Sequence, residues 1–240
     1  MATISLCMIV KNESAVLARC LDSIADLMDE IIIVDTGSTD NTKEIAAQYT
    51  SRIYDFKWTS DFSAARNFSF SKATMEYIYT ADADEILDDA NRERFLRLKD
   101  ALLPEIEIVQ MKYVTQGTFD TVLNAKKEYR PKLFRRLRTF TWIDPIHETV
   151  RLTPVTFDSD VEILHCPQSL HSKRDFSIFI KAFEHDGQFS PKIRTMYAKE
   201  LLKTGDKKDF TDAKPIFQLI FDNDPADDAR KEAACVLARI

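Results

Sequence analysis

The segment Ile4–Val10 (ISLCMIV) is a nearly continuous apolar run, and the polar residues Lys11, Asn12 and Glu13 follow it at once. A strand that is buried on both faces of a parallel sheet has this character, without a polar residue at every second position. The run Glu30–Val34 (EIIIV) is similar, and apolar residues at helical spacing separate the two runs. Strand, helix and strand in this order predict a parallel α/β unit.

The same alternation continues downstream of these two strands. The order strand, helix, strand, helix, strand indicates a doubly wound sheet, in which ligands bind outside the carboxyl ends of the strands. The further predicted elements are a first helix with Ser14 as its N-cap, a helix over 41–49 behind the turn Asp35–Asp40, a strand Ile53–Phe56, a helix over 62–73 and a strand Tyr77–Thr80.

Three carboxylates, Asp82, Asp84 and Glu85, come directly after the strand Tyr77–Thr80. Carboxylates suit Mg²⁺ or Mn²⁺, which bind through one or two of them together with substrate phosphates and water. Their position past the end of a strand favours a metal-held diphosphate. The chain has 39 acidic residues, however, so this spacing also arises by chance in a solvated turn.

The pattern changes in the second half of the chain. The runs Ile106–Thr115 and Lys132–Arg138 predict strands of a mixed part of the sheet. From about Ser172 the apolar spacing is helical again. We therefore expect a catalytic domain over 1–171 and a small α-helical region over 172–240, whose last helix is still running at Ile240, as in a truncated chain or the start of a repeat array.

Composition limits the class of protein. The chain has 240 residues, 45% hydrophobic content and a net charge of −6, which predicts a folded α/β protein and argues against nucleic-acid binding. The block Lys126–Arg138 is basic and suits phosphate groups. The four cysteines form no zinc or disulfide pattern. The sequence shows no transmembrane segment and no signal peptide, so we expect a cytoplasmic protein, or a peripheral one at the inner face of the membrane.

Four segments stand out in order along the chain: CMIVKNE (7–13), VDTGSTDNT (34–42), WTSDFSAARN (58–67) and DADE (82–85), the last being a DXD motif. Taken in this order, they resemble the family 2 glycosyltransferases of the GT-A fold. A later segment, Trp142–Glu148 (WIDPIHE), is similar to one in a subgroup that carries tetratricopeptide-like helices behind its catalytic domain.

The resemblance implies a nucleotide-diphospho-sugar donor, most simply a UDP-sugar, a Mn²⁺ or Mg²⁺ ion and transfer with inversion. It assigns Asp84 to the metal and Asp82 to the ribose or to a metal-bound water. A bound cation stabilises the negative charge that grows on the leaving diphosphate. His165 is a candidate third ligand, and its alternative role is structural.

The loop after the first strand and the turn Asp35–Asp40 are expected to form one crevice that binds the nucleotide. Val10, Asn12 and Glu13 belong to the loop after the first strand. The resemblance places Asp35 at the base, where a carboxylate suits the imide N–H of uracil. The alternative is that Asp35 holds the turn or caps the next helix, a role that Asp40 fits better.

Arg66 is expected near the diphosphate or the sugar, since its planar cation suits both. An ion pair of Arg66 with Asp82 is a compatible structural role. Trp58 and Phe62, in the same segment, are expected in the core or in a wall.

Inversion requires a general base that takes the proton of the acceptor hydroxyl. Glu148 is favoured, Asp144 comes second, and His147 is a third candidate. The alternative for Glu148 is an ion pair with Arg130, Arg135 or Arg136.

Other functions remain as alternatives. A sugar-phosphate nucleotidyltransferase would carry a glycine-rich loop after the first strand, and Cys7–Glu13 has no glycine. A non-catalytic scaffold would bind partners through the helical tail, which also suits self-association. The acceptor is expected among glycans of cell-envelope biosynthesis, lipid-linked molecules or proteins.

Overall fold

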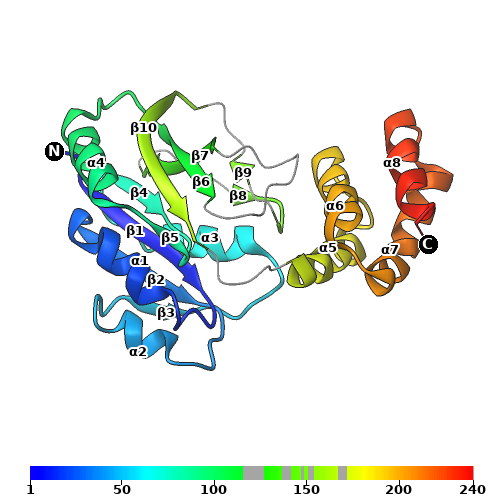
Figure 1. Ribbon diagram of the computed structural model, residues 1–240, viewed down its shortest axis with the longest axis horizontal. Helices are drawn as coiled ribbons and strands as arrows, with labels where there is room; N and C mark the ends of the chain where they lie inside the picture. Colours follow the sequence, from blue (N-terminus) through cyan, green and yellow to red (C-terminus); the bar gives the residue numbers. More distant parts are fainter. Residues whose placement is uncertain (116–126, 137–141, 147–148, 151–153, 167–171, 240) are drawn as a thin grey trace. The chain divides into compact units, whose positions relative to one another are not determined.

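The computed structural model of the protein describes residues 1–115, 127–136, 142–146, 149–150, 154–166 and 172–239. Its centre is an eight-stranded sheet with the order β3-β2-β1-β4-β7-β6-β10-β5 (Figure 1). The strands of this sheet are β1 Ile4–Val10, β2 Glu30–Asp35, β3 Ile53–Asp55, β4 Tyr77–Thr80, β5 Glu85–Ile86, β6 Ile108–Thr115, β7 Lys127–Arg135 and β10 Thr156–His165. Strands β8 Trp142–Ile143 and β9 Thr149–Val150 form a separate pair.

The sheet is mixed and mainly parallel, as predicted. Strands β3, β2, β1 and β4 run parallel to one another, and β10 runs parallel to β6. Strand β7 is antiparallel to β4 and to β6, and β5 is antiparallel to β10. The carboxyl ends of β1, β2, β4 and β10 therefore lie at the same edge of the sheet, where the polar loops of the sequence begin.

Helices cover both faces of the sheet (Figure 1). Leu6 and Met8 of β1 belong to the buried cluster that includes residues of α1 and α4, whereas Cys7 packs in the cluster that includes Phe68 of α3. Successive residues of a strand point to opposite faces, so a strand covered on both sides is apolar at nearly every position. The helices around the sheet are α1 Leu17–Ile24, α2 Thr42–Ala46, α3 Phe62–Phe70 and α4 Asp89–Ala101, with a 3₁₀ turn at Ala25–Leu27.

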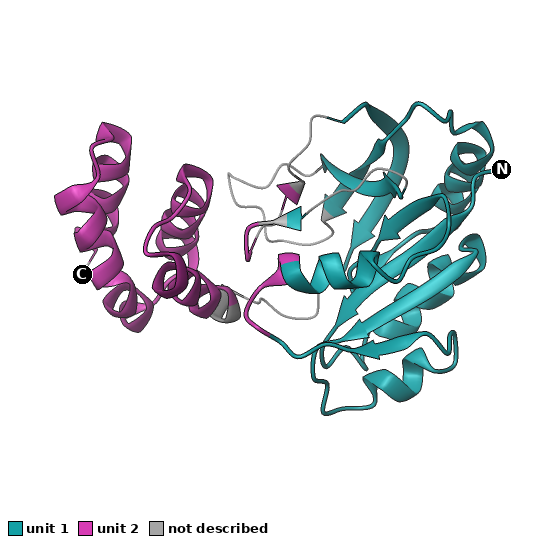
Figure 2. Ribbon diagram, turned by 180° about the vertical axis from the view of Figure 1, so that it is seen from behind, with its two compact units in different colours: residues 1–58, 64–142, 150–168 teal, residues 59–63, 143–149, 169–240 magenta. Residues whose placement is uncertain are grey.

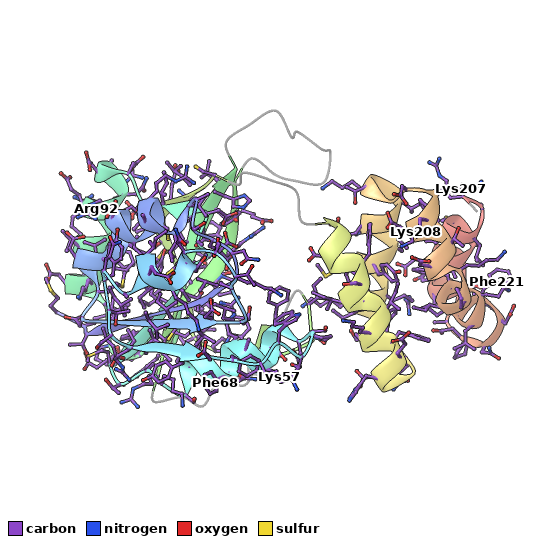
Figure 3. The ribbon with its side chains drawn as sticks, turned by 90° about the horizontal axis from the view of Figure 1, so that it is seen from below. Lys57, Phe68, Arg92, Lys207, Lys208 and Phe221 are labelled. Atoms are coloured by element: carbon purple, nitrogen blue, oxygen red, sulfur yellow. The ribbon has the colours of Figure 1, made fainter. Side chains whose placement is uncertain are left out.

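Arg92 and Phe68, both marked in Figure 3, show how these helices are attached. The Arg92 guanidinium of α4 donates to the carbonyl oxygen of Ser23 and to Asp26, at the end of α1. The Phe68 ring of α3 lies 5.2 Å from the Phe56 ring, centroid to centroid. One helix is thus tied by a charged hydrogen bond and the other by aromatic packing.

The predicted N-cap at Ser14 is wrong. Helix α1 begins at Leu17, and no side chain caps it. The backbone N–H of Ser14 donates instead to Asp40 in the loop after β2, at 3.2 Å. The long-range hydrogen bond keeps residues 14–16 out of the helix.

The chain divides into two compact units (Figure 2). The first contains residues 1–58, 64–142 and 150–168, and the second contains 59–63, 143–149 and 169–240. The helices of the second unit are α5 Ser172–Asp186, α6 Pro191–Thr204, α7 Lys207–Asn223 and α8 Asp227–Leu237. Their core is aromatic: the buried Tyr197 ring stacks on Phe179 at 4.7 Å and packs against Phe217 at 5.3 Å.

Two helices of this second unit, α6 and α7, begin at side-chain caps. The Ser190 hydroxyl accepts from the N–H of Ile193, and Asp206 forms a capping box with Asp209. Lys207 and Lys208 lie at the start of α7 and Phe221 near its end (Figure 3). No helix in the described part of the chain is long and apolar enough to span a membrane. The four cysteines are free thiols.

Candidate active site

The turn after β4 places its three carboxylates in three different environments. The buried Ala81 and Ala83 alternate with the acids, so Asp82 is exposed and the Asp84 side chain is 18% exposed. Glu85, the first residue of β5, is only 2% exposed. Three acids that differ this much in hydration have different chemical roles.

Glu85 supports the turn from inside. Its carboxylate forms a buried ion pair with Lys132 of β7, and Oε2 accepts a hydrogen bond from the N–H of Asp82 at 3.2 Å. Burial raises the pKa of Glu85, and the charge of Lys132 acts against this rise. Because a buried charge needs a partner, the pair fixes the backbone on which Asp82 and Asp84 stand.

Asp82 faces solvent close to several cations. Partial desolvation raises the pKa of its carboxyl, but the charges of Lys132, Arg66 and Arg130 outweigh this effect and lower the pKa below the usual value. Asp82 is therefore ionised at neutral pH. Arg66 lies near enough to Asp82 for its charge to act on it, as the predicted ion pair would require.

Asp84 is in direct contact with His165 at the end of β10. The Oδ2 atom of Asp84 lies 3.0 Å from Nε2 of His165, and its carbonyl oxygen accepts from the N–H of Cys166 at 2.9 Å. The Nδ1 atom of His165 is buried and has no hydrogen-bond partner among the described residues. The antiparallel pairing of β5 with β10, with His165 opposite Glu85, brings the two side chains together.

These residues fit a divalent cation only as a partial ligand set. In the described part of the chain, no group of three or more His, Cys, Asp or Glu side chains could hold a metal ion by itself. The contacting pair Asp84 and His165 offers one carboxylate and one imidazole. Mg²⁺ and Mn²⁺ accept this kind of incomplete protein shell, since substrate phosphates and water supply the other ligands.

The loops after β1 and β2 are joined into one wall. The carbonyl oxygen of Val10 accepts from both the N–H and the hydroxyl of Thr36, at 3.0 and 3.2 Å. Asn12 has a positive φ of 56°, and its Oδ1 accepts from the N–H of Thr39 at 2.8 Å. The N–H of Glu13 donates to Thr42 at 2.8 Å. The structure thus brings Val10, Asn12 and Glu13 next to the Asp35 turn.

Asp40 holds the far end of this wall. Its carboxylate accepts from the backbone N–H groups of Ser14 and Thr42, at 3.2 and 3.1 Å, and from the Thr42 hydroxyl. Partial burial opposes ionisation, but these hydrogen bonds prevail and lower the pKa of Asp40 to about 2. Asp40 therefore organises the start of α2, the role for which its sequence position suits it.

The two carboxylate oxygens of Asp35 have different environments. It is 1% exposed, and Oδ1 accepts from the N–H groups of Gly37 and Ser38, both at 2.9 Å. Gly37 has a φ of 104°, which favours glycine. The second oxygen, Oδ2, is buried and has no partner among the described residues. Asp35 therefore stabilises the turn through Oδ1, as the alternative role predicted. Oδ2 remains an acceptor without a donor among the described residues.

Arg66 and Asn67 of α3 connect two of the sequence motifs. The Arg66 guanidinium lies 5.0 Å from the centroid of the Trp142 ring. The Asn67 side chain binds the backbone N–H and carbonyl of Trp142, at 2.9 and 3.0 Å. Trp58 and Phe62, earlier in the same motif, are half-buried. The last two residues of one motif, Arg66 and Asn67, therefore contact the first residue of the other, Trp142.

Of the candidate general bases, only Asp144 is described. It belongs to the second unit, has a φ of 72°, and its Oδ2 lies 3.4 Å from the Thr149 hydroxyl and 3.7 Å from Nζ of Lys192. His147 and Glu148 lie outside the described residues. The arginines considered as partners of Glu148 bind other groups: Arg130 binds Glu128, and Arg135 and Arg136 bind the carbonyl oxygens of Pro104 and Met75.

A family model decides the classification. The model for glycosyl transferase family 2 matches residues 5–153, which include the two joined loops, the acidic turn and the Trp142 segment. The chain belongs to glycosyl transferase family 2.

Two curated relatives match part of this family 2 chain. A TPR repeat-containing protein of Synechococcus elongatus is 48% identical over 87 residues, which cover 36% of this chain and 22% of that protein. The SPbeta prophage-derived glycosyltransferase SunS of Bacillus subtilis is 33% identical over 132 residues, 53% of this chain and 31% of SunS. The matched regions thus span under a third of the length of these relatives.

A solved structure shares the fold of this family 2 chain. Glucosyl-3-phosphoglycerate synthase from Mycobacterium tuberculosis, in complex with Mn²⁺, UDP-glucose and phosphoglyceric acid, aligns with a TM-score of 0.55 and 19% identity. The alignment covers 79% of this chain and 82% of the synthase. At this identity the likeness shows the GT-A fold alone.

Two functional contacts of the family 2 chain were missed by sequence reasoning. Lys132 was one cation within a basic block assigned to phosphate, yet it is buried against Glu85. Tyr113 was one apolar residue of a strand, yet its ring packs 4.9 Å from the His165 ring. The sequence does carry a signal for Lys132, because it lies between Pro131 and Leu133 inside a strand. A lysine that is buried in a strand needs an acidic partner.

Proposed function

We propose that the protein is a metal-dependent, inverting glycosyltransferase that moves a sugar from a UDP-sugar to a hydroxyl or similar nucleophile of its acceptor. The observation that carries this proposal is the contact of Asp84 with His165 at the carboxyl ends of β4 and β10. The proposal is supported because this contact joins a carboxylate, a hard donor, and an imidazole, a borderline donor, at the edge of the sheet where α/β folds bind nucleotides. We assign catalysis to residues 1–171, and residues 172–240 form the helical extension.

In this proposal Asp84 and His165 hold a Mn²⁺ or Mg²⁺ ion, and the donor diphosphate supplies further oxygens. The cation stabilises negative charge on the departing nucleoside diphosphate. Asp82 accepts from the ribose or from a metal-bound water. Arg66 contributes a permanent positive charge on the same side. Nε2 of His165 lies on the side of the Asp84 carboxylate and is the ring nitrogen that a shared ion would use.

The nucleotide base is assigned to Asp35. Its Oδ2 is a buried acceptor that lacks a donor among the described residues, and the imide N–H of uracil is a donor of suitable geometry. The walls of the base site are the loops that contain Val10, Asn12 and Glu13. Since Oδ1 is already held by Gly37 and Ser38, the orientation of the carboxylate is fixed before the nucleotide arrives.

Inversion needs a base on the acceptor side of the sugar. We assign this role to Glu148, with Asp144 as the second candidate. A base there removes the proton of the acceptor hydroxyl as the oxygen attacks the anomeric carbon. The acceptor is a glycan, a lipid-linked molecule or a protein side chain, and transfer to a cell-envelope glycan from the cytoplasmic side is the arrangement that we favour.

A thermal-shift panel tests the donor and the metal together. UDP-, GDP-, CDP- and dTDP-sugars are added with and without Mn²⁺ to the wild type and to Asp84→Asn. A ligand at 100 times its Kd stabilises the folded state by about 2.7 kcal/mol, so a clear rise in Tm is expected for the UDP-sugar with Mn²⁺ and not for the variant.

Asp89→Asn is the matched control, because Asp89 is an exposed acid of the neighbouring helix α4. It should respond like the wild type. Absence of any stabilisation of the wild type, or an equal response of Asp84→Asn, would overturn the proposed function. A non-catalytic scaffold would give the first of these results.

A further inference from the structure

Behind the contact of Asp84 with His165 lies a stack of planar side chains from three strands. The His165 ring of β10 packs against the Tyr113 ring of β6, with centroids 4.9 Å apart and an angle of 33° between the planes. The Arg130 guanidinium of β7 lies 3.6 Å from the centroid of the same Tyr113 ring. Tyr113 is 4% exposed, so its ring is enclosed by these neighbours and by the core.

The strand register explains why these three residues meet. Tyr113 lies opposite Ile163, two residues before His165, and Met111, two residues before Tyr113, lies opposite Arg130. Residues two apart on a strand, and residues opposite one another, point to the same face. All three side chains therefore project from one face of three adjacent strands.

The stack replaces the support that a metal-binding histidine usually has. In most metal sites the second ring nitrogen of the histidine donates to a carboxylate, a carbonyl or a water, and this hydrogen bond orients the ring. Nδ1 of His165 has no such partner among the described residues. Packing against Tyr113, together with the Asp84 contact, supports the plane of the imidazole.

Arg130 holds the tyrosine in turn. Its side chain is 45% exposed, and its Nε donates to Glu128 at 2.6 Å, so the guanidinium is anchored while it lies over the ring. The Lys132 ammonium is also near, 5.6 Å from the ring centroid. Cations over an aromatic face are attracted by its quadrupole, and this attraction resists rotation of the Tyr113 side chain.

We propose that Tyr113, with Arg130 packed over it, is a positioning residue that holds the His165 imidazole in the orientation required at the metal site. The inference rests on the proposed function, because it concerns the metal that Asp84 and His165 would share. Tyr113 would act through the imidazole against which it packs. Its contribution is to preorganise a ligand that has no hydrogen bond behind it.

The test measures Mn²⁺ binding rather than turnover. The Kd of Mn²⁺ is determined by electron paramagnetic resonance of the free ion, in the presence of saturating UDP, for the wild type, Tyr113→Phe and Tyr113→Leu. Tyr113→Phe keeps the ring and should bind within about twofold of the wild type. Tyr113→Leu removes the ring and should weaken Mn²⁺ binding about tenfold, as loss of outer-shell support does at other metal sites.

Tyr77→Leu is the matched control. Tyr77 is also 4% exposed, but it lies at the start of β4, at the other end of the strand from Asp82. It should lower stability as much as Tyr113→Leu and leave the Mn²⁺ affinity unchanged. If Tyr77→Leu weakens Mn²⁺ binding as much as Tyr113→Leu, the effect is general loosening of the core and the inference fails.

Arg130→Gln provides a second variant that spares the core. Removal of a positive charge near Asp82 would by itself strengthen the binding of a cation. The positioning role predicts the opposite, a weakening of Mn²⁺ binding of about threefold. Unchanged or tighter binding in Arg130→Gln overturns the inference, even if Tyr113→Leu does not fold.

The two proposals fail in different ways. If the wild type binds no Mn²⁺ with UDP, the proposed function itself is wrong. If the wild type binds Mn²⁺ and Tyr113→Leu binds it equally well, only the positioning role is wrong.

Discussion

Asn67 of α3 binds both backbone polar groups of Trp142: Nδ2 donates to the carbonyl oxygen at 3.0 Å, and Oδ1 accepts from the N–H at 2.9 Å. The two residues are 75 positions apart in the sequence. An amide side chain that replaces a neighbouring strand in this way holds the segment before Asp144 in one register. Asn67 is also next to Arg66, whose guanidinium lies near the Trp142 indole.

Asn67→Ala is expected to destabilise the protein by about 2 kcal/mol. The substitution removes two hydrogen bonds and leaves the polar groups of Trp142 without partners, at a cost of about 1–3 kcal/mol. Urea denaturation measures the change. Asn223→Ala is the control, because Asn223 is exposed and binds only a carbonyl of its own helix, so its loss should cost under about 0.5 kcal/mol. Equal effects of the two substitutions would contradict the clamp role.

Glu85→Gln is expected to unfold the protein more readily than Asp84→Asn in the absence of ligands. The first variant leaves the buried Lys132 ammonium without its carboxylate, which costs roughly 3 kcal/mol. Asp84→Asn removes the charge of a partly exposed carboxylate, so it should lower the free energy of unfolding less. Denaturant titrations of the metal-free proteins compare the two. The double variant Glu85→Gln/Lys132→Met should recover part of the loss, and failure to do so would mean that the pair is not coupled.

The contribution of Asp40 to the free energy of unfolding should be lost at acidic pH. Its pKa is about 2 in the folded state and near 3.9 in an unfolded chain. A lowered folded-state pKa stabilises the protein above the unfolded value, and the contribution disappears as the pH falls from about 4 to about 2. The difference in unfolding free energy between the wild type and Asp40→Asn should narrow over this interval. If the difference in unfolding free energy does not vary with pH, the Asp40 carboxylate does not stabilise the folded state in this way.

Asp35→Asn should change the nucleotide preference. The asparagine Oδ1 can still accept from Gly37 and Ser38, but an amide donor then replaces the free Oδ2 and faces the imide N–H of uracil. UDP affinity should fall by about tenfold or more, whereas CDP, whose N3 is an acceptor, should lose less. Isothermal titration with both nucleotides tests this. If the affinities for UDP and CDP fall equally, Asp35 does not bind the nucleotide base.

Local sequence pattern predicted some strands closely and one poorly, since the predicted strand Lys132–Arg138 begins five residues after the start of β7 (Lys127–Arg135) and extends past its end. The predicted bounds of β1 and β4 match the structure, because strands covered on both faces are largely apolar and stand out from the polar residues that follow them. The start of α1 was predicted wrongly, since Ser14 has the composition of an N-cap but its N–H is taken by Asp40. Nothing within a few residues of Ser14 indicates that competition.

The candidate site was predictable in position but not in detail. The order of the motifs places Asp35, Arg66, Asp82 and Asp84 in the first unit, at or near one edge of the sheet. The burial of Glu85 depends on Lys132, 47 residues away, and the environment of His165 depends on Tyr113 and on the register of β6 with β10. Pairings of this kind follow from strand order, which the sequence alone does not state.

The second unit takes two short segments, 59–63 and 143–149, from within the part of the sequence that the family model matches. In this unit Ser60 accepts a hydrogen bond from Lys181 at 3.1 Å, and the Phe62 N–H donates to the Pro145 carbonyl at 2.8 Å. The helices are therefore not a cassette that can be cut off or exchanged at residue 172. A chimaera with helices from another protein would have to be redesigned at three places in the chain, so the helical region and the two loops should change together during evolution.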